Sequence, residues 1–418
     1  MSTTAHERRS ALLRTGRRLT VAAAALAVAG TAATAATAPP ASAGPPQWTI
    51  QGTTNPAGAN ANNVLLAVSC PSATACLAVG FGKTRHVGAA MAESWNGTSW
   101  TTTPSAAPPG ASQSDLRAVS CTSATACTAV GFYRDTSGTQ HDLAERWDGS
   151  SWTVQSAPDP AGSQIPSLTG VSCTSATSCE AVGSYLSPSI GSYTDLAEVW
   201  NGLTWTIQPT RPAFSKMDFE LNSVSCASPS SCMAVGQYVS RFGGGSYQAT
   251  WAERWDGTSW SGLFPDVEGA AGDLMGVSCT TATSDCTAVG WYRDASGSVF
   301  ALAERWNGST WSLQFPASAV TASSMTLLGV SCPATTACMA VGEAYVPAVG
   351  PGVTVTVAES WNGSTWTLDN TPNPGGARES DLNAVSCPSA AVCTAAGSWS
   401  GATSSGPLPA ATLGERYS

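Results

Sequence analysis

This sequence has few charged residues and lacks the apolar spacing of amphipathic helices. Only 11% of the 418 residues are charged, two are lysines and three are histidines. No segment keeps the apolar spacing of an amphipathic helix; apolar runs of roughly four to eight residues alternate instead with Gly, Pro, Asn and Ser, which predicts many short strands. The missing helical period excludes a helical solenoid, and the chain is long enough for an all-β fold with a substantial core.

Other absences bear on function. After residue 43 no apolar stretch approaches the length needed to span a bilayer. A serine nucleophile elbow, a zinc-protease helix and a phosphate-binding loop are also missing from the sequence. We therefore expect neither a membrane-spanning protein nor a member of those three catalytic classes.

The first 43 residues are typical of a secretory signal peptide. Five arginines between residues 8 and 18 precede the apolar run VAAAALAVAG, and Ala41-Ser42-Ala43 gives an Ala-x-Ala cleavage signal. These features predict a mature start at Gly44 and a secreted, extracellular protein. An Ala-rich disordered tail is the alternative. The arginine pairs also suggest twin-arginine export, but that route would require disulfides to form in a reducing cytosol, so general secretion is favoured.

The mature chain is acidic. Removing residues 1–43 takes five Arg and one Glu from 18 basic and 27 acidic residues, which leaves a formal charge of −13. Such a surface repels phosphate backbones and anionic lipid heads. We expect no nucleic-acid partner, no membrane association and a monomer.

Seven internal copies determine the predicted architecture. The first cysteines of successive copies lie 51 to 55 residues apart, and each copy holds four strand-like runs: L-x-[AG]-V-S-C, C-x-A-V-G or close to it, A-E-x-W, and a run that starts at tryptophan. This period predicts a seven-bladed β-propeller with four antiparallel strands per blade. Small residues in the first two runs suit the crowded axis. The tryptophans of the last two runs suit the rim, so we interpret Trp95, Trp100 and their counterparts as packing residues rather than ligand platforms.

The turn between each pair of tryptophans is Asn-Gly or Asp-Gly, which predicts a tight hairpin with positive φ available at both central positions. Asn96, Asn307 and Asn362 also fit a glycosylation sequon. Asp replaces Asn in two copies, so the turn explains the pattern better than a glycan does.

The fourteen cysteines fall into seven local pairs. In an exported protein they predict one disulfide across the first hairpin of every blade. Zinc is the alternative, but it needs four ligands per site and the mature chain has only two histidines. The predicted pairs are Cys70 with Cys76, Cys121 with Cys127, Cys173 with Cys179, Cys226 with Cys232, Cys279 with Cys286, Cys332 with Cys338, and Cys387 with Cys393.

The two ends of the mature chain complement one another. The sequence stops at LGERYS, where other copies continue to a second tryptophan strand, and QWTIQ from Gln47 supplies such a strand. We therefore predict that residues 44–51 complete the C-terminal blade, so that 44–418 form one closed propeller domain.

These residues resemble a known type of repeat. Gly80, Gly131 and Gly183 each follow Ala-Val and precede a Trp-[Asn/Asp]-Gly-x-x-Trp hairpin, and this combination is similar to kelch or galactose-oxidase-type repeats. A similar disulfide-hairpin repeat is found in secreted bacterial propellers. The copies differ from kelch in having one glycine rather than two and in the added cysteines, and no copper-ligand set like that of galactose oxidase is recognisable. The resemblance implies a fold and leaves function open.

Candidate ligand residues lie where the copies differ. The loops after the second and fourth strands emerge together on what we call the variable face, and the cysteine and tryptophan hairpins emerge on the opposite, hairpin face. Tyr and Arg among Gly and Ser are typical of sites that bind sugars by stacking and hydrogen bonds, although solvated loops have the same composition. The candidates are Arg85, His86, Tyr133, Arg134, His141, Tyr238, Tyr292 and Arg293.

Two sets of carboxylates and one His pair are further candidates. Asp115, Glu220, Asp273 and Asp381 precede the first strand's leucine in four copies, where they either hold a cation such as Ca²⁺ or cap loop amides. The Glu of A-E-x-W recurs in every copy, which favours a structural hydrogen bond. The two histidines of the candidate set, with their neighbouring Tyr and Arg, would supply a base for a lyase.

Together these patterns predict a secreted, non-catalytic propeller that binds glycans or an extracellular protein partner through its variable face, with no cofactor apart from that Ca²⁺. The alternative is a polysaccharide hydrolase or lyase that uses the same face, and a third option is a packing component of a secreted complex. A close pair of non-recurring carboxylates would favour the enzyme.

Overall fold

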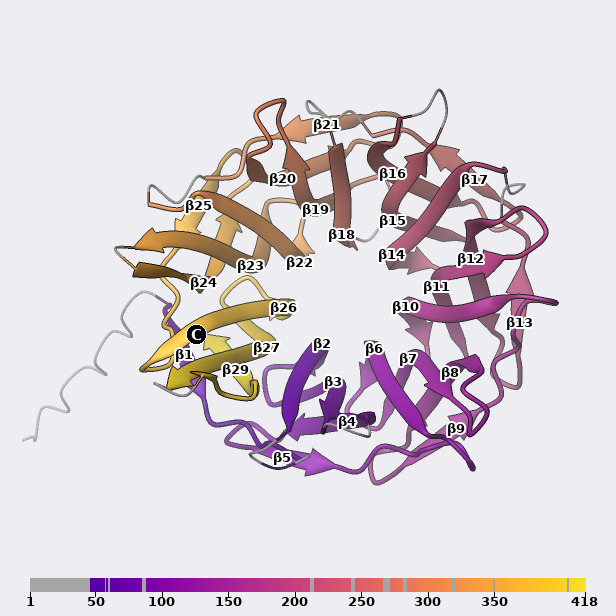
Figure 1. The fold of residues 1–418 in the computed structure, drawn as a ribbon, viewed down its shortest axis with the longest axis horizontal. Helices are drawn as coiled ribbons and strands as arrows, with labels where there is room; N and C mark the ends of the chain where they lie inside the picture. The colour runs from indigo at the N-terminus through magenta and orange to yellow at the C-terminus, as the bar shows by residue number, and fades with distance from the viewer. Residues whose placement is uncertain are drawn as a thin grey trace, which may run out of the picture. The chain divides into compact units, whose positions relative to one another are not determined.

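Seven antiparallel sheets are arranged in a ring around a common centre (Figure 1), as the repeats predict. The computed structural model describes residues 46–418 except 57, 59–60, 85–87, 211–213, 242–244, 266–270, 281–283, 318–320, 349 and 404–405. Within these residues the regular structure consists of strands. The predicted signal peptide lies outside them and stays a prediction.

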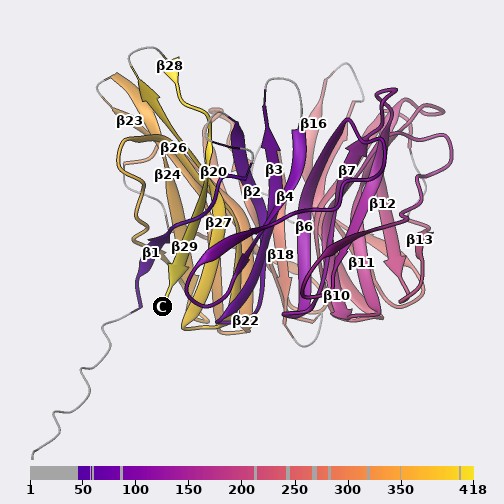
Figure 2. The same ribbon diagram turned by 90° about the horizontal axis from the view of Figure 1, so that it is seen from below.

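Each sheet is one blade, and its strands follow chain order from the centre to the rim, except that blade 7 takes its outermost strand from the N-terminus. Blades 1 to 3 consist of β2 (Asn62–Ser72), β3 (Ala75–Lys83), β4 (Gly88–Trp95) and β5 (Trp100–Thr103); β6 (Gln113–Ser123), β7 (Ala126–Arg134), β8 (Gln140–Trp147) and β9 (Trp152–Gln155); and β10 (Gln164–Ser175), β11 (Ser178–Ser187), β12 (Ser192–Trp200) and β13 (Trp205–Gln208). Figure 2 shows the ring from the side, with the strands running between its two faces.

The other four blades repeat this order. They consist of β14 (Met217–Ser228), β15 (Ser231–Ser240), β16 (Tyr247–Trp255) and β17 (Trp260–Leu263); β18 (Ala271–Cys279), β19 (Cys286–Arg293), β20 (Val299–Trp306) and β21 (Trp311–Gln314); β22 (Ser324–Ala334), β23 (Ala337–Ala348), β24 (Gly350–Trp361) and β25 (Trp366–Asp369); and β26 (Ala377–Ser389), β27 (Val392–Thr403), β29 (Ala411–Tyr417) and β1 (Trp48–Gln51), with β28 (Gly406–Pro407) paired to β27.

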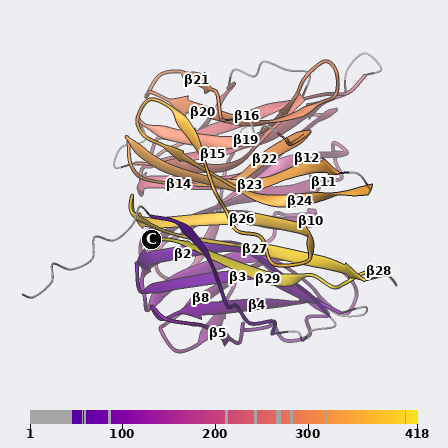
Figure 3. The same ribbon diagram turned by 90° about the vertical axis from the view of Figure 1, so that its left-hand side faces the viewer.

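The N-terminal strand closes the last blade, as predicted from the two chain ends. β1 pairs with β29 in an antiparallel register that sets Trp48 opposite Tyr417 and Gln51 opposite Gly414. Trp48 is buried and its ring lies 5.5 Å from that of Tyr417. Figure 3 shows the junction of the two end blades, where β26, β27 and β29 lie beside β2 and β3. The edge strand of blade 7 is therefore paired although its partner comes from the other end of the chain.

A serine in each first strand joins neighbouring blades. The backbone N–H of Cys121 donates to Oγ of Ser69 at 2.9 Å, and the N–H of Cys70 donates to Oγ of Ser386 at 2.9 Å across the closing junction. The same bond recurs at the other five junctions, at 2.9 to 3.0 Å. This ring of bonds explains why serine precedes the first cysteine in every copy.

The cysteines pair locally in all seven blades, as predicted, and each disulfide joins the first strand of a blade to the second. The second cysteine of every pair is buried. The bridges join Cys70 to Cys76, Cys121 to Cys127, Cys173 to Cys179, Cys226 to Cys232, Cys279 to Cys286, Cys332 to Cys338, and Cys387 to Cys393. With both sulfurs of each pair bonded to one another, the cysteines are not zinc ligands, and seven disulfides suit an oxidising environment.

The described residues form no helix that is long and apolar enough to cross a membrane.

The recurring glutamates are buried, and three of them are hydrogen-bond acceptors, as expected. The carboxylates of Glu93, Glu145 and Glu359 accept backbone N–H bonds of 2.8 to 3.1 Å from the segment that follows the fourth strand of a blade. All seven recurring glutamates have no exposed surface. They fix the connection between one blade and the next.

The turn between the tryptophans differs from the expected hairpin. Trp95 pairs with Trp100, which leaves a four-residue loop, and among Asn96 and Gly97 only the glycine has positive φ, at 98°. The Asn96 side-chain oxygen instead accepts the N–H groups of Thr98 and Ser99, each at 3.0 Å. An aspartate makes the same bonds, so this Asx turn explains the exchange of Asn for Asp.

Candidate functional site

A β-bulge interrupts the first strand of every blade at the same place. In blade 2, Leu116 lies opposite Gly131 and Ala118 lies opposite Val130, so Arg117 is the extra residue. A Cβ atom built on Gly131 would lie 2.0 Å from the carbonyl oxygen of Asp115, and the glycines of the other blades have the same close contact. The bulge therefore requires the glycine of the second strand, and it turns the extra side chain out of the usual alternation.

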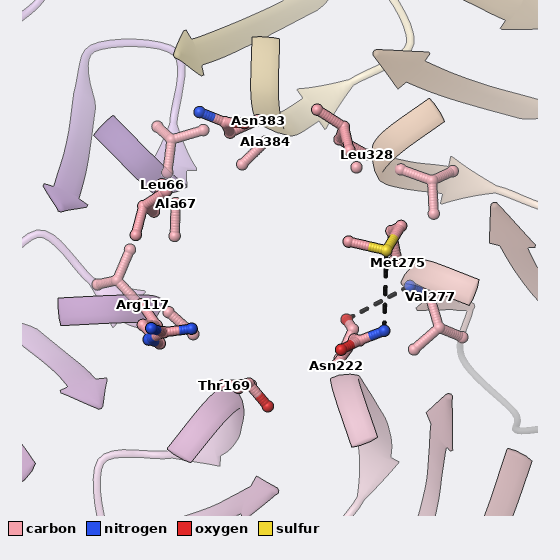
Figure 4. Close-up of a pocket in the computed structure, with 18 of the residues that line it drawn as sticks. Leu66, Ala67, Arg117, Thr169, Asn222, Met275, Val277, Leu328, Asn383 and Ala384 are labelled. Atoms are coloured by element: carbon pink, nitrogen blue, oxygen red, sulfur yellow. Dashed lines mark hydrogen bonds between the residues drawn. The ribbon is translucent and has the colours of Figure 1, made fainter. Parts of the chain in front are cut away.

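The seven bulged residues line the centre of the ring. Their side chains surround a cavity of about 370 Å³, the channel cavity, shown along its axis in Figure 4. In contrast to the leucines and valines around them, these residues differ from blade to blade. They are Leu66, Arg117, Thr169, Asn222, Met275, Leu328 and Asn383.

Three of the four polar bulged residues connect blades. The amides of Asn222 and Asn383 and the hydroxyl of Thr169 each donate to the carbonyl oxygen of the leucine in the next blade; the two amide bonds measure 3.0 and 2.9 Å. Arg117 does not take part. Within the described part of the chain its guanidinium has no hydrogen bond or ion pair, and it lies 5.1 Å from the centre of the Phe132 ring.

A second cavity opens from the channel onto the variable face. This channel-mouth pocket measures about 320 Å³, lies between blades 2, 3 and 4, and shares Arg117, Thr169 and Asn222 with the channel cavity. Arg134, at the end of β7, and Tyr193, on β12, also line it. The pocket is of a size that holds a small ligand, and it combines charged, amide, hydroxyl and aromatic groups.

Two of its three charged groups, Arg134 and Glu220, are held in place by neighbours. Nε and one terminal nitrogen of Arg134 donate to Oε1 of Gln140 at 3.2 and 3.1 Å, and Nε2 of Gln140 donates to the carbonyl oxygen of Pro166 at 2.9 Å. On another wall, Glu220 accepts a bond of 3.2 Å from Nε2 of Gln237. A preorganised guanidinium loses less entropy when it binds a ligand.

The pocket also contains a strained residue. Ile165 lines it with φ of 45°, a left-handed conformation that β-branched side chains avoid. Its side chain is 40% exposed, so burial of the isoleucine does not account for the conformation. Strain of this kind concentrates at ligand sites.

Of the candidate ligand residues in blade 2, only Arg134 faces this pocket. The Tyr133 ring stacks on His141, with centroids 5.0 Å apart, and Nδ1 of His141 lies 2.6 Å from the Asp159 carboxylate. That contact, with a smaller one to Asp135, raises the pKa of His141. A raised pKa favours the charged imidazole at the expense of a general base. Arg85 and His86 lie outside the described residues.

The candidates in blades 4 and 5 lie in other surroundings. Tyr238 belongs to an aromatic cluster with Phe219 and Trp251. Tyr292 stacks on Phe300 at 5.4 Å beside a cavity of about 250 Å³ between blades 5 and 6. Arg293 lies over its neighbour Trp291. The described candidates therefore lie in several places on the variable face rather than in one.

The four carboxylates proposed to hold Ca²⁺ do not form a group. Asp273 accepts a bond of 2.8 Å from Asn222, and Asp381 accepts the N–H of Ser398 at 3.0 Å. Burial raises the pKa of Asp115, of Asp381 and of Asp273, the last to about 7. Among the described residues no three His, Cys, Asp or Glu side chains lie together as metal ligands would. The partners of Asp273 and Asp381 lie in strands β14 and β27, so these bonds are not the capping of loop amides that was the alternative.

A pocket with several carboxylates lies between blades 6 and 7. Glu343, Glu379 and Asp381 line this acidic pocket of about 280 Å³ together with Trp399. Burial raises the pKa of Glu343, and the nearby Asp381 and Glu379 add to the effect. Glu343 has no acidic counterpart in the other blades, whereas Asp218 of blade 4 occupies the position of Glu379, so the pocket holds one non-recurring carboxylate beside a second carboxylate.

Comparison with known proteins agrees with the fold. No protein-family model matches the chain, and no curated protein matches it significantly. A solved structure of YCF48 bound to a D1 peptide is 14% identical, covers 90% of this chain and 96% of that one, and superposes with a TM-score of 0.50. A protein of unknown function from Dyadobacter fermentans is 11% identical, with coverages of 75% and 97% and a TM-score of 0.47.

A lectin structure is also similar to this chain, with a lower TM-score. The Aleuria aurantia lectin, a six-bladed β-propeller that recognises fucose, is 14% identical, with coverages of 69% and 88% and a TM-score of 0.39. Likenesses at this level of identity establish the fold alone. The chain is a seven-bladed β-propeller with a disulfide in each blade. Its resemblance to kelch repeats stays a prediction.

Proposed function

We propose that this protein is a secreted, non-catalytic propeller that binds a glycan in the channel-mouth pocket. The observation that carries the proposal is the combination in one cavity of the donors of Arg117 and Arg134 with the aromatic ring of Tyr193. Sugars present hydroxyls at their edges and apolar C–H groups on their faces, so donors beside an aromatic ring suit them. The seven disulfides support an extracellular setting.

Two equivalent arginines provide a matched test. Arg134 and Arg293 occupy the same position in the FYRD and WYRD segments of blades 2 and 5, but only Arg134 lines the pocket. We expect Arg134→Ala to weaken the best ligand of a glycan array at least about tenfold, because a charge-assisted hydrogen bond contributes roughly 1.5–3 kcal/mol. Arg293→Ala should change the affinity by less than about twofold.

Both variants should keep the melting temperature of the parent, since the two side chains lie at the surface end of their strands. Equal losses from Arg134→Ala and Arg293→Ala would place the site elsewhere on the variable face. Failure of the protein to bind any glycan on the array would overturn the proposal itself.

The acidic pocket supports a second candidate function, a polysaccharide hydrolase. Such an enzyme needs a carboxyl that keeps its proton and a second carboxyl close to it; the raised pKa of Glu343 suits the first role, and Glu379 lines the same pocket. The same glycan panel distinguishes the two functions if released reducing ends are assayed. Release that Glu343→Gln abolishes would establish the enzyme, and its absence at high protein concentration would favour binding alone.

A further inference from the structure

Arg117 stands out from the ring of bulged residues. The other polar members, Thr169, Asn222 and Asn383, use their donors to join blades, whereas Arg117 has no hydrogen bond or ion pair within the described residues and is exposed to the channel. It therefore contributes no bond to blade assembly. A guanidinium in this position has five N–H donors and no acceptor, so it can be satisfied only by water or by a ligand.

The surroundings of Arg117 fix its direction. Its guanidinium lies over the Phe132 ring at 5.1 Å, and the buried Asp115 carboxylate is near enough to act on it electrostatically. Asp115 is only 8% exposed and cannot itself meet a ligand freely, whereas Arg117 is exposed. The Phe132 ring is therefore the contact that positions the guanidinium, and the Asp115 carboxylate acts on it only electrostatically, without an ion pair.

Arg117 and Arg134 line the same pocket, which concentrates positive charge in an acidic protein. The mature chain has only 13 basic residues, and two of them meet here. Glu220, the carboxylate on the pocket's lining, is held by Gln237. At physiological ionic strength charges beyond about 8 Å are screened, so a ligand in the pocket responds to these local groups rather than to the net charge of the molecule.

We infer that the ligand is an acidic glycan and that Arg117 and Arg134 bind the carboxylate of its uronic acid. The inference rests on the proposed function and adds the class of sugar. Two planar guanidinium forks offer donors in the geometry that a carboxylate accepts, and a neutral sugar leaves most of these donors to water. Tyr193 remains for the uncharged part of the ring.

The test uses two ligands that share one sugar chain and differ in whether its carboxyl groups are charged or methyl-esterified. Oligogalacturonate and its fully methyl-esterified form are titrated calorimetrically into the parent protein and into Arg117→Gln, Arg134→Gln and Arg293→Gln. We expect the parent to prefer the acid by at least about tenfold, and Arg117→Gln and Arg134→Gln to lower that preference to about twofold or less. Arg293→Gln should keep it. Arg117→Lys retains the charge but loses the fork, so it should give an intermediate preference.

Each outcome bears on a different claim. Equal affinity of the parent for acid and ester, or a preference that survives both Gln variants, overturns the inference and leaves glycan binding intact. Binding of hexaglutamate with the same arginine dependence, without binding of oligogalacturonate, identifies an acidic protein partner and overturns both. Unchanged melting temperatures of the variants show that a lost preference is not a lost fold, as expected for a side chain that joins no blades.

Discussion

At the scale of the residue, one glycine determines where a variable side chain points. Gly131 lets β6 and β7 approach closely at the bulge, and the bulge directs Arg117 into the channel. The backbone conformation is thus constant in all seven blades while the exposed side chain is free to vary. In blade 2, where Arg117 joins no blades, this arrangement separates stability, which the glycine and leucine provide, from the recognition that we propose for the bulged residue.

Gly131→Ala tests this separation. The added Cβ would overlap the Asp115 carbonyl oxygen, which is backbone and cannot rotate away, so the strands must move apart. We expect a loss of about 3 kcal/mol in the free energy of unfolding, measured by urea titration. Gly52→Ala is the control, because nothing lies within 4 Å of its added Cβ. Equal stabilities of the two variants would contradict the role given to the bulge.

The sequence predicts the position of Arg134 but not that of Arg117. Arg134 ends a strand at the variable face, where loops of differing sequence meet. Arg117 lies inside an otherwise constant strand, and regular alternation would place its side chain between blades, opposite in direction to Leu116. The available signals were the variable letter in L-x-[AG]-V-S-C and the lone glycine of the next strand, which is typical of bulges.

At the scale of the element, short contacts repeated at every junction hold the blades together. The bond from the Cys70 N–H to Ser386 continues across the closing junction, so blades 7 and 1 meet as any other pair does. β1 completes this arrangement by pairing with β29. The closure could be predicted because Trp48 and Tyr417 occupy positions that a paired tryptophan fills elsewhere. The serine bonds between blades could not be predicted, because a small polar residue in a strand does not reveal its partner in another blade.

Deleting residues 44–51 should destabilise the blade at the opposite end of the chain. The deletion removes the β1–β29 pairing and the burial of Trp48, which together should cost several kcal/mol, since burying a large aromatic contributes on the order of 3 kcal/mol. The truncated protein should melt lower and aggregate through its unpaired edge. Joining the ends and reopening the chain in the Asn201-Gly202 turn should keep the melting temperature. A truncation without effect would contradict the closure.

At the scale of the whole molecule, the ring encloses buried carboxyl groups at each junction. Burial raises the pKa of Glu93, Glu145 and Glu359 to about 7 and that of Glu198 and Glu415 to about 8. Around Glu198, Asp159 and Glu180 add to the effect of burial. In the exposed turns the sign is opposite, because N–H and hydroxyl donors lower the pKa of Asp148 and Asp256 to about 2. The buried glutamates therefore release their protons at a higher pH than usual, and the exposed turn aspartates release theirs at a lower pH than usual.

These shifts predict a stability maximum near pH 4–5. The turn aspartates contribute stability above their unfolded pKa of 3.8, and this contribution is lost as the pH falls toward 2. The buried glutamates act in the other direction: from their unfolded pKa of 4.5 up to about 7–8, the unfolded chain has released protons that the folded chain retains, so stability falls as the pH rises.

The melting temperature should therefore decrease between pH 5 and pH 8. In Glu198→Gln, which cannot titrate, the loss of unfolding free energy over this range should shrink by about 3 kcal/mol, since one pKa unit corresponds to about 1.4 kcal/mol. Asp159→Asn serves as the comparison, because removing the neighbouring charge should lower the pKa of Glu198 without removing its titration. A melting temperature that is constant or rises from pH 5 to pH 8 would show that the interior glutamates are ionised in the folded protein.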